Sequence, residues 1–226
     1  ADAGRAETLS FCSPLLWQVV HHSILARERR AAHGAVALAI ERLHGDDLEA
    51  HWEELAVHFA GAGRFLDAAR SARRAGQILA SQQLLDGAAS TFERALGWTE
   101  SARNAGEPGD GCTLAQAWLS LDAGAVGALR GDVGAAERHL HLAMDLAAEM
   151  WMPEVEARAQ LELGCLYRAR SRDTLAVAHL DAALGGVSEH RDCVWSQTVG
   201  VEALEALGQL AMSAGDGAVA RQRFEE

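Results

Sequence analysis

Histidine is the residue of this sequence with the widest capacity for chemistry, because an imidazole can ligate a metal ion or transfer a proton near neutral pH. The 226 residues include ten histidines. His51 and His58 lie two turns apart along a helix, too far to chelate one ion together. Glu137 and His141 are spaced i, i+4 and could reach a common ion, but no third ligand accompanies them. We therefore expect solvated surface histidines and no metal site.

Residues that could act as nucleophiles are few and have no recognised arrangement. All 20 basic residues are arginine, so the chain has no P-loop lysine, Schiff-base lysine or lysine general base. The cysteines lack a CxxC spacing, and we expect them to be free thiols in a reducing cytosol. They are Cys12, Cys112, Cys165 and Cys193. The sequence predicts no catalytic activity and no cofactor for this chain.

The charge and hydropathy of the chain argue against two classes of partner. The formal net charge is −12, which disfavours binding to nucleic acid or to an anionic membrane surface. No apolar run approaches the roughly 20 residues that span a bilayer, and no signal peptide is evident. We expect a cytoplasmic protein. Because the helical pattern continues to the last residue, we also expect a fragment of a longer protein.

The elements that must position any site are helices. Alanine and leucine dominate and runs of alternating β-branched residues are absent, which is typical of an all-α fold. A small residue recurs with a second small residue twelve positions later, and two helices can cross closely only where neither has a bulky side chain. The pairs are Ala56/Ala68, Gly76/Ala88, Gly124/Ala136, Gly164/Ala176 and Gly208/Ala220. This pattern resembles the tetratricopeptide repeat, which implies a right-handed helical solenoid.

Turn-forming residues divide the chain into parts. Asn, Gly and Pro concentrate at 104–109, and we expect a long loop there that joins two separable subarrays. The expected parts are a helical segment over 1–46, a first subarray over 47–98, a loop over 99–113 and a second subarray over 114–226. The aspartates that follow the turns of the second subarray are expected to cap the next helix. They are Asp132, Asp173 and Asp216.

A second resemblance covers residues 9–41, LSFCSPLLWQVVHHSILARERRAAHGAVALAIE. This stretch is similar to the segment that closes the ATPase half of bacterial signalling NTPases of the STAND type, an AAA-like class. The positions that fit are Phe11, Leu15, Leu25, Arg29, Arg30, His33, Val36, Ala37, Ile40 and Glu41, while Cys12 and Ser13 depart from the pattern. The resemblance implies that 1–46 joins an upstream ATPase to the repeats. The interdomain joint would be formed by Arg27, Arg29, Arg30 and His33.

The tetratricopeptide resemblance also implies a binding groove. With the repeats aligned on Gly124, Trp118 falls at a position that faces the concave groove in such arrays. The same alignment gives a groove of Trp118, Asp122, Arg158, Glu162, Arg168, Glu202, Glu205 and Gln209. A groove of mixed charge with one aromatic side chain suits a peptide or a partner helix. The alternative is that these charges neutralise one another and form only a structural ion-pair network.

The sequence therefore favours a non-catalytic protein-interaction and regulatory module of a multidomain bacterial signalling ATPase, linked to an adenylate or guanylate cyclase. Two alternatives stay open: the inducer-sensing tail of a LuxR-type transcription regulator, and a free-standing scaffold. The expected partners are a protein or peptide, the upstream ATPase domain, and a second copy of the chain through exposed terminal helices. Direct contact with nucleic acid or a membrane is not expected.

Overall fold

The computed structural model describes residues 13, 15, 18–19, 23–45, 47–190 and 192–225. This part of the chain is all-α, with ten α-helices, a 3₁₀ turn at Glu49–His51 and no strand. The helices are α2 (Ala26–His44), α3 (Trp52–Gly61), α4 (Phe65–Ser81), α5 (Leu85–Asn104), α6 (Gly109–Arg130), α7 (Val133–Met150), α8 (Pro153–Ala169), α9 (Asp173–Ser188), α10 (Val194–Ser213) and α11 (Gly217–Glu225). The fitted position Phe11 and the departing position Cys12 lie outside the described residues. None of the described helices is long and apolar enough to cross a membrane.

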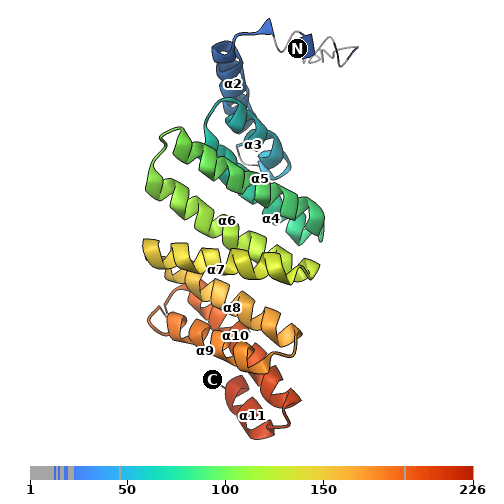
Figure 1. Ribbon diagram of the computed structural model, residues 1–226, viewed down its shortest axis with the longest axis vertical. Coiled ribbons are helices and arrows are strands. Elements are labelled where there is room, and N and C mark those ends of the chain that lie inside the picture. The colour runs from blue at the N-terminus through green and yellow to red at the C-terminus, as the bar shows by residue number, and fades with distance from the viewer. Residues whose placement is uncertain are drawn as a thin grey trace, which may run out of the picture.

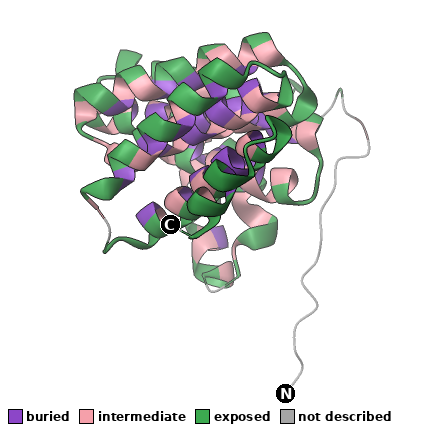
Figure 2. Cartoon of the chain, turned by 90° about the horizontal axis from the view of Figure 1, so that it is seen from below, coloured by how far each residue is buried: buried purple, intermediate pink, exposed green. Residues whose placement is uncertain are grey.

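The helices stack in chain order along the longest axis of the molecule (Figure 1). Successive helices form pairs: α4 with α5, α6 with α7, α8 with α9, and α10 with α11. The first helix of each pair also contacts the first helix of the next, so α4, α6, α8 and α10 form a continuous layer. Buried residues gather where helices face one another, and exposed residues lie outside (Figure 2). We call the surface of this layer that is turned away from α5, α7, α9 and α11 the inner face.

Each of these four pairs crosses at a glycine. A Cβ atom added to Gly164 would lie 2.6 Å from Leu180 Cγ and 3.3 Å from the backbone oxygen of Ala176, so only glycine fits at this crossing. A large side chain fills the same place at the other crossings: Phe92 on Gly76, Leu140 on Gly124, and Phe224 on Gly208. The twelve-residue spacing therefore marks the helix crossings at these four glycines.

Two of the three predicted aspartate caps are present. Asp132 and Asp216 each accept a hydrogen bond from the backbone amide three residues on, at 3.0 and 3.1 Å. The prediction for Asp173 is wrong: Arg172 occupies the N-cap position of α9, and Asp173 lies in the first helical turn. There its carboxylate still interacts favourably with the positive end of the helix dipole.

The predicted loop over 99–113 is much shorter in the structure. Helix α5 continues to Asn104 and α6 begins at Gly109, so only 105–108 connect them. The last turns of α5 stay helical because Thr99 and Ala102 are fully buried. Apolar clusters also cross the expected boundary. One joins Leu66 and Ala102 to Cys112 and Ala115, and a larger one joins residues of α3, α4 and α5 to residues of α6.

Helix α2 lies at one end of the stack and contacts chiefly α3. The described residues of α2 that are buried are Ala37 and Ile40, because a single neighbouring helix covers only a narrow stripe of its surface. Val36 and Leu43 lie at apolar helical spacing from Ile40, and their spacing alone predicts that they share its buried stripe, but they are 39% and 78% exposed.

Candidate functional site

The inner face carries a repeating set of polar positions, fixed by their distance from each crossing glycine. The position six residues before the glycine is Arg70, Trp118, Arg158 or Glu202. The position one residue after it is Gln77, Ala125, Cys165 or Gln209. All of these side chains are half-buried or exposed, whereas most of the residues that flank them are buried. The groove residues that the sequence predicts on α6, α8 and α10 thus recur in register, and α4 contributes an equivalent set.

The residues of α4 were missed by the sequence analysis. The pairs Ala56/Ala68 and Gly76/Ala88 make α4 both the second helix of one unit and the first helix of the next. The sequence analysis nevertheless assigned groove positions only to the units that cross at Gly124, Gly164 and Gly208. The offsets that select Trp118 and Asp122 from Gly124 select Arg70 and Arg74 from Gly76.

Trp118 and Asp122 of α6 both contact Arg73 of α4. Its Nε atom donates to Asp122 Oδ2 at 2.6 Å, and its guanidinium lies 4.5 Å from the centre of the Trp118 ring. Gln77 Nε2 donates to the same carboxylate oxygen at 3.1 Å. Burial raises the pKa of Asp122, while the charge and hydrogen bond of Arg73 and the hydrogen bond of Gln77 oppose that rise. The guanidinium that lies over Trp118 therefore comes from α4.

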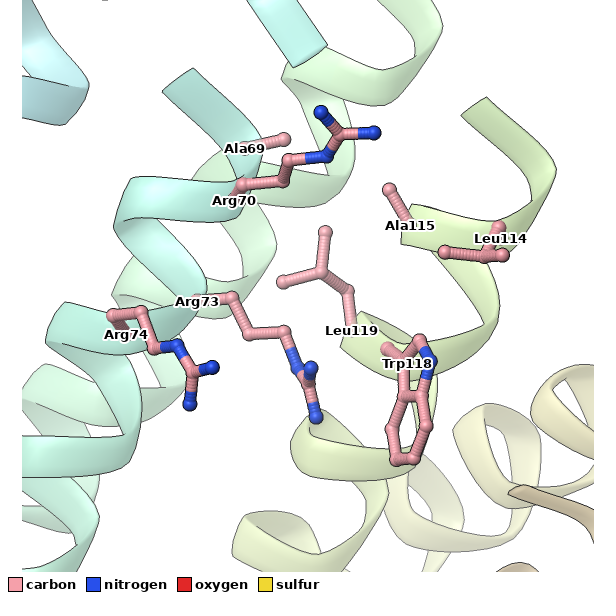
Figure 3. Close-up of a pocket in the computed structure, with 8 residues that line it drawn as sticks. All are labelled: Ala69, Arg70, Arg73, Arg74, Leu114, Ala115, Trp118 and Leu119. Atoms are coloured by element: carbon pink, nitrogen blue, oxygen red, sulfur yellow. The ribbon is translucent and has the colours of Figure 1, made fainter. Parts of the chain in front are cut away.

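A cavity of about 280 Å³ lies between α4 and α6 beside this cluster. Figure 3 shows three arginines of α4 on one side and Leu114 and Trp118 of α6 on the other. Buried apolar side chains complete the wall: Ala69, Ala115 and Leu119. The cavity thus combines an apolar lining with a basic rim.

The middle of the inner face, on α8, is acidic. Glu162 is half-buried, and burial raises its pKa, as do the nearby charges of Glu202 and Asp122. Arg158 opposes this rise but forms its ion pair with Glu154 of its own helix, at 3.0 Å. The Nε atom of Arg158 is buried and makes no hydrogen bond. This part of the surface therefore favours a positive charge more than a negative one.

The contact between α8 and α10 involves three further predicted residues. Arg168 donates from Nη1 to Gln209 Oε1, and Gln209 Nε2 donates to Glu205 Oε1 at 3.0 Å. Burial raises the pKa of the neighbouring Cys165 thiol, and the charge of Glu162 raises it further. A thiol with a raised pKa is a poor nucleophile at neutral pH. Nothing in this cluster activates a group for covalent chemistry.

The four residues predicted at the interdomain joint lie in different environments in the structure. Arg27 and Arg30 are exposed on α2, and Arg29 donates to the backbone oxygen of Ile24 at 3.0 Å. His33 points instead at α3, where its ring occupies the space beside Gly61. Within this chain His33 thus serves the contact between α2 and α3.

Glu137 and His141 are the two residues whose spacing would let them share a metal ion. Glu137 lies 3.9 Å from Arg172. Among the residues described, no group of three or more His, Cys, Asp or Glu side chains could hold a metal ion.

Comparison with known proteins gives a likeness of fold. No protein family and no curated protein matches the sequence. The chain is similar in structure to BtubC (BKLC) from P. vanneervenii. The TM-score is 0.57 at 13% sequence identity, over 90% of this chain and 89% of that one. At this identity the likeness supports the all-helical architecture over nearly the whole chain and says nothing about function.

Proposed function

We propose that this chain is a tetratricopeptide-like, right-handed solenoid that serves as a non-catalytic protein-interaction module of a bacterial signalling ATPase. One observation carries the proposal. Four alternate helices, α4, α6, α8 and α10, present polar and aromatic side chains in register on one face, with a cavity between α4 and α6. Helix-lined grooves with a few polar groups recognise peptides and partner helices. The raised pKa of Cys165 supports a binding role over covalent chemistry.

The partner segment would lie across α4, α6 and α8, with Trp118 as the central anchor. Tryptophan and arginine are the residue types most enriched where truncation costs about 2 kcal/mol or more of binding energy. The cation–π contact with Arg73 holds the indole in one orientation before binding. A preorganised side chain loses less conformational entropy when the partner docks.

Regulation of an upstream ATPase would act through α2. This helix contacts chiefly α3, so it can change position without disturbing the stack from α4 to α11. A partner that binds one arrangement of α2 more tightly than another shifts the population toward it. Arg27 and Arg30, exposed on α2, would contact the ATPase domain, as the STAND resemblance implies.

Site-specific crosslinking in cells tests the proposal. A photo-crosslinking amino acid would replace Leu114, which is 41% exposed beside the cavity, and, as a matched control, the exposed Arg138 of α7. We expect a discrete crosslinked protein from position 114, lost when Trp118→Ala is added, and no such product from position 138. Equal products from both positions, or none from position 114, would contradict a binding role for the inner face.

A further inference from the structure

We infer that the cavity between α4 and α6 receives one large apolar side chain from an acidic segment of a partner protein, and that Arg70 and Arg74 bind the carboxylates beside it. This inference rests on the proposed function and names the chemistry of the partner. It is argued from the size of the cavity, the state of the three arginines and the charge of the rest of the chain.

The size of the cavity suits a single side chain. Pockets that enclose drug-sized ligands measure roughly 300–1,000 Å³, and this one measures about 280 Å³. Its floor is apolar, formed by the buried Ala69, Ala115 and Leu119. Leu114 and Trp118 form the wall on α6 (Figure 3). A phenylalanine or leucine placed there would exchange water for apolar contacts on several sides.

The three arginines of α4 differ in how far their charges are already neutralised. Arg73 forms an ion pair with Asp122, with its Nε atom 2.6 Å from Asp122 Oδ2. Arg74 donates to the neutral amide oxygen of Gln77, at 3.3 Å. Arg70 lies 3.7 Å from Asp67, but that carboxylate is held more closely by Arg64, at 2.7 Å. Arg70 and Arg74 are exposed. Their guanidinium groups at the rim can therefore donate hydrogen bonds to a carboxylate of a partner.

The charge of the rest of the chain sharpens this preference. A protein with a net charge of −12 repels an acidic segment over most of its surface. A local group of arginines whose charges are only partly neutralised then directs such a segment to one place, and the repulsion elsewhere adds specificity.

The acidic side chains farther along the inner face set a limit to the segment. The charge of Glu202 already raises the pKa of Glu162, and Glu205 lies on the same helix as Glu202. The acidic part of the segment would therefore end near α6, and only its uncharged continuation would reach α8, whereas a basic segment would bind at α8 and α10 instead. Acidic and basic probes thus report on different parts of the same face.

Binding of three short fluorescent peptides to the purified chain tests the inference. The first has glutamates on both sides of one phenylalanine, the second has alanine in place of the phenylalanine, and the third has lysines in place of the glutamates. We expect the first peptide to bind at least about tenfold more tightly than the second, the factor that follows from burying one aromatic side chain. Its affinity should also fall as salt is added.

Variants of the protein locate the binding. Arg70→Gln with Arg74→Gln should weaken the first peptide by about tenfold or more. The matched control, Arg138→Gln with Arg221→Gln, makes the same change of net charge on the exposed surfaces of α7 and α11 and should leave the affinity unchanged. Circular dichroism of both double variants confirms that the fold is intact.

The inference is overturned if the first peptide binds no more tightly than the second or third, or equally well to both double variants. If only the lysine peptide binds, and Glu202→Gln with Glu205→Gln weakens it, the inner face is a binding surface but the inference about its partner is wrong. If no peptide binds, the inference also fails, and the crosslinking from position 114 decides the proposed function on its own.

Discussion

The Nδ1 atoms of His33 and His58 lie 3.0 Å apart across the contact between α2 and α3. One imidazole donates the hydrogen and the other accepts it, so this bond cannot form when both rings are protonated. A second pair, His44 and His51, stacks with ring centres 3.8 Å apart where the chain passes from α2 to α3. Ile40 is buried on the face of α2 between the two pairs. Docking of α2 therefore includes a hydrogen bond that requires at least one neutral imidazole in the His33–His58 pair.

Acidification should weaken the docking of α2. Burial lowers the pKa of His33, and the positive charges of His58 and Arg29 lower it further. The undocked state then binds protons more readily than the docked state. Stability is full above the ordinary histidine pKa of about 6.5 and is lost as the pH falls from there toward the lowered pKa. Hydrogen exchange of the α2 amides should therefore accelerate, relative to α6, between about pH 7.5 and pH 5.5.

Burial lowers the pKa of His179 in α9, and the charge of His141 lowers it further. Acid therefore also affects the stability of α9. For this reason the experiment must follow the α2 amides themselves and not the unfolding of the whole protein. Glu54 lies 4.0 Å from His58 Nε2, and Arg30 is a further charged group on α2. The control is His33→Gln, which can hydrogen-bond to His58 and does not titrate. An unchanged pH response of α2 in this variant would show that the histidine pair is not its cause.

Gly164→Ala should destabilise the protein by about 1–3 kcal/mol, the usual cost of overpacking. The added Cβ would lie 2.6 Å from Leu180 Cγ and 3.3 Å from a backbone oxygen, so α8 and α9 must separate. Gly164→Leu should be worse. The control is Gly185→Ala, because a Cβ there meets nothing within 4 Å and alanine has the higher helix propensity. Urea unfolding should give a lower midpoint for the first variant and an equal or higher one for the control.

Glu107 should hold the connection between α5 and α6 in place. Its Oε1 atom accepts from the backbone amide of Phe65 at 3.0 Å and lies 3.4 Å from that of Leu66, at the start of α4. Loss of a cap of this kind costs about 0.5–2 kcal/mol. We expect Glu107→Ala to reduce stability by about that amount and to increase proteolysis at 105–108.

The two sides of this connection should unfold together. The sequence favoured separable subarrays over 47–98 and 114–226, but the apolar cluster that contains Phe92 also contains Leu119 and Val126. Division at 105–108 would expose it. After a single cut there, we expect the two pieces to remain associated and to melt in one transition. Independent melting of two helical pieces would restore the original expectation.

Arg158→Ala with Arg168→Ala should separate binding from stability. Arg158 pairs with Glu154 on its own helix and its side chain is 42% exposed, and an exposed pair of this kind contributes at most about 1 kcal/mol. We therefore expect a melting temperature close to that of the unchanged protein, with loss of the crosslink from position 114. A large fall in melting temperature with the crosslink retained would instead support a structural ion-pair network.

The sequence by itself determined the all-α class and the places where helices cross. Both follow from local rules: helix propensity acts residue by residue, and a glycine such as Gly164 is needed wherever a large side chain of the next helix must fit against the backbone. The sequence also placed Trp118, Arg158 and Glu202 in register, because equal spacing from the crossing glycine puts them on one face.

Only the tertiary structure decided which of these residues meet. Arg73 and Asp122 are 49 positions apart, and their contact depends on how α4 of one pair packs against α6 of the next, which no local pattern reports. The same holds for His33 and His58, of which the sequence assigned the first to an interdomain joint and the second to the solvated surface, and for the 99–113 loop. Turn-forming residues predicted that loop correctly only at 105–108, because burial of Thr99 and Ala102 kept the rest of α5 helical. Packing between distant segments outweighed local propensity wherever a buried partner was available.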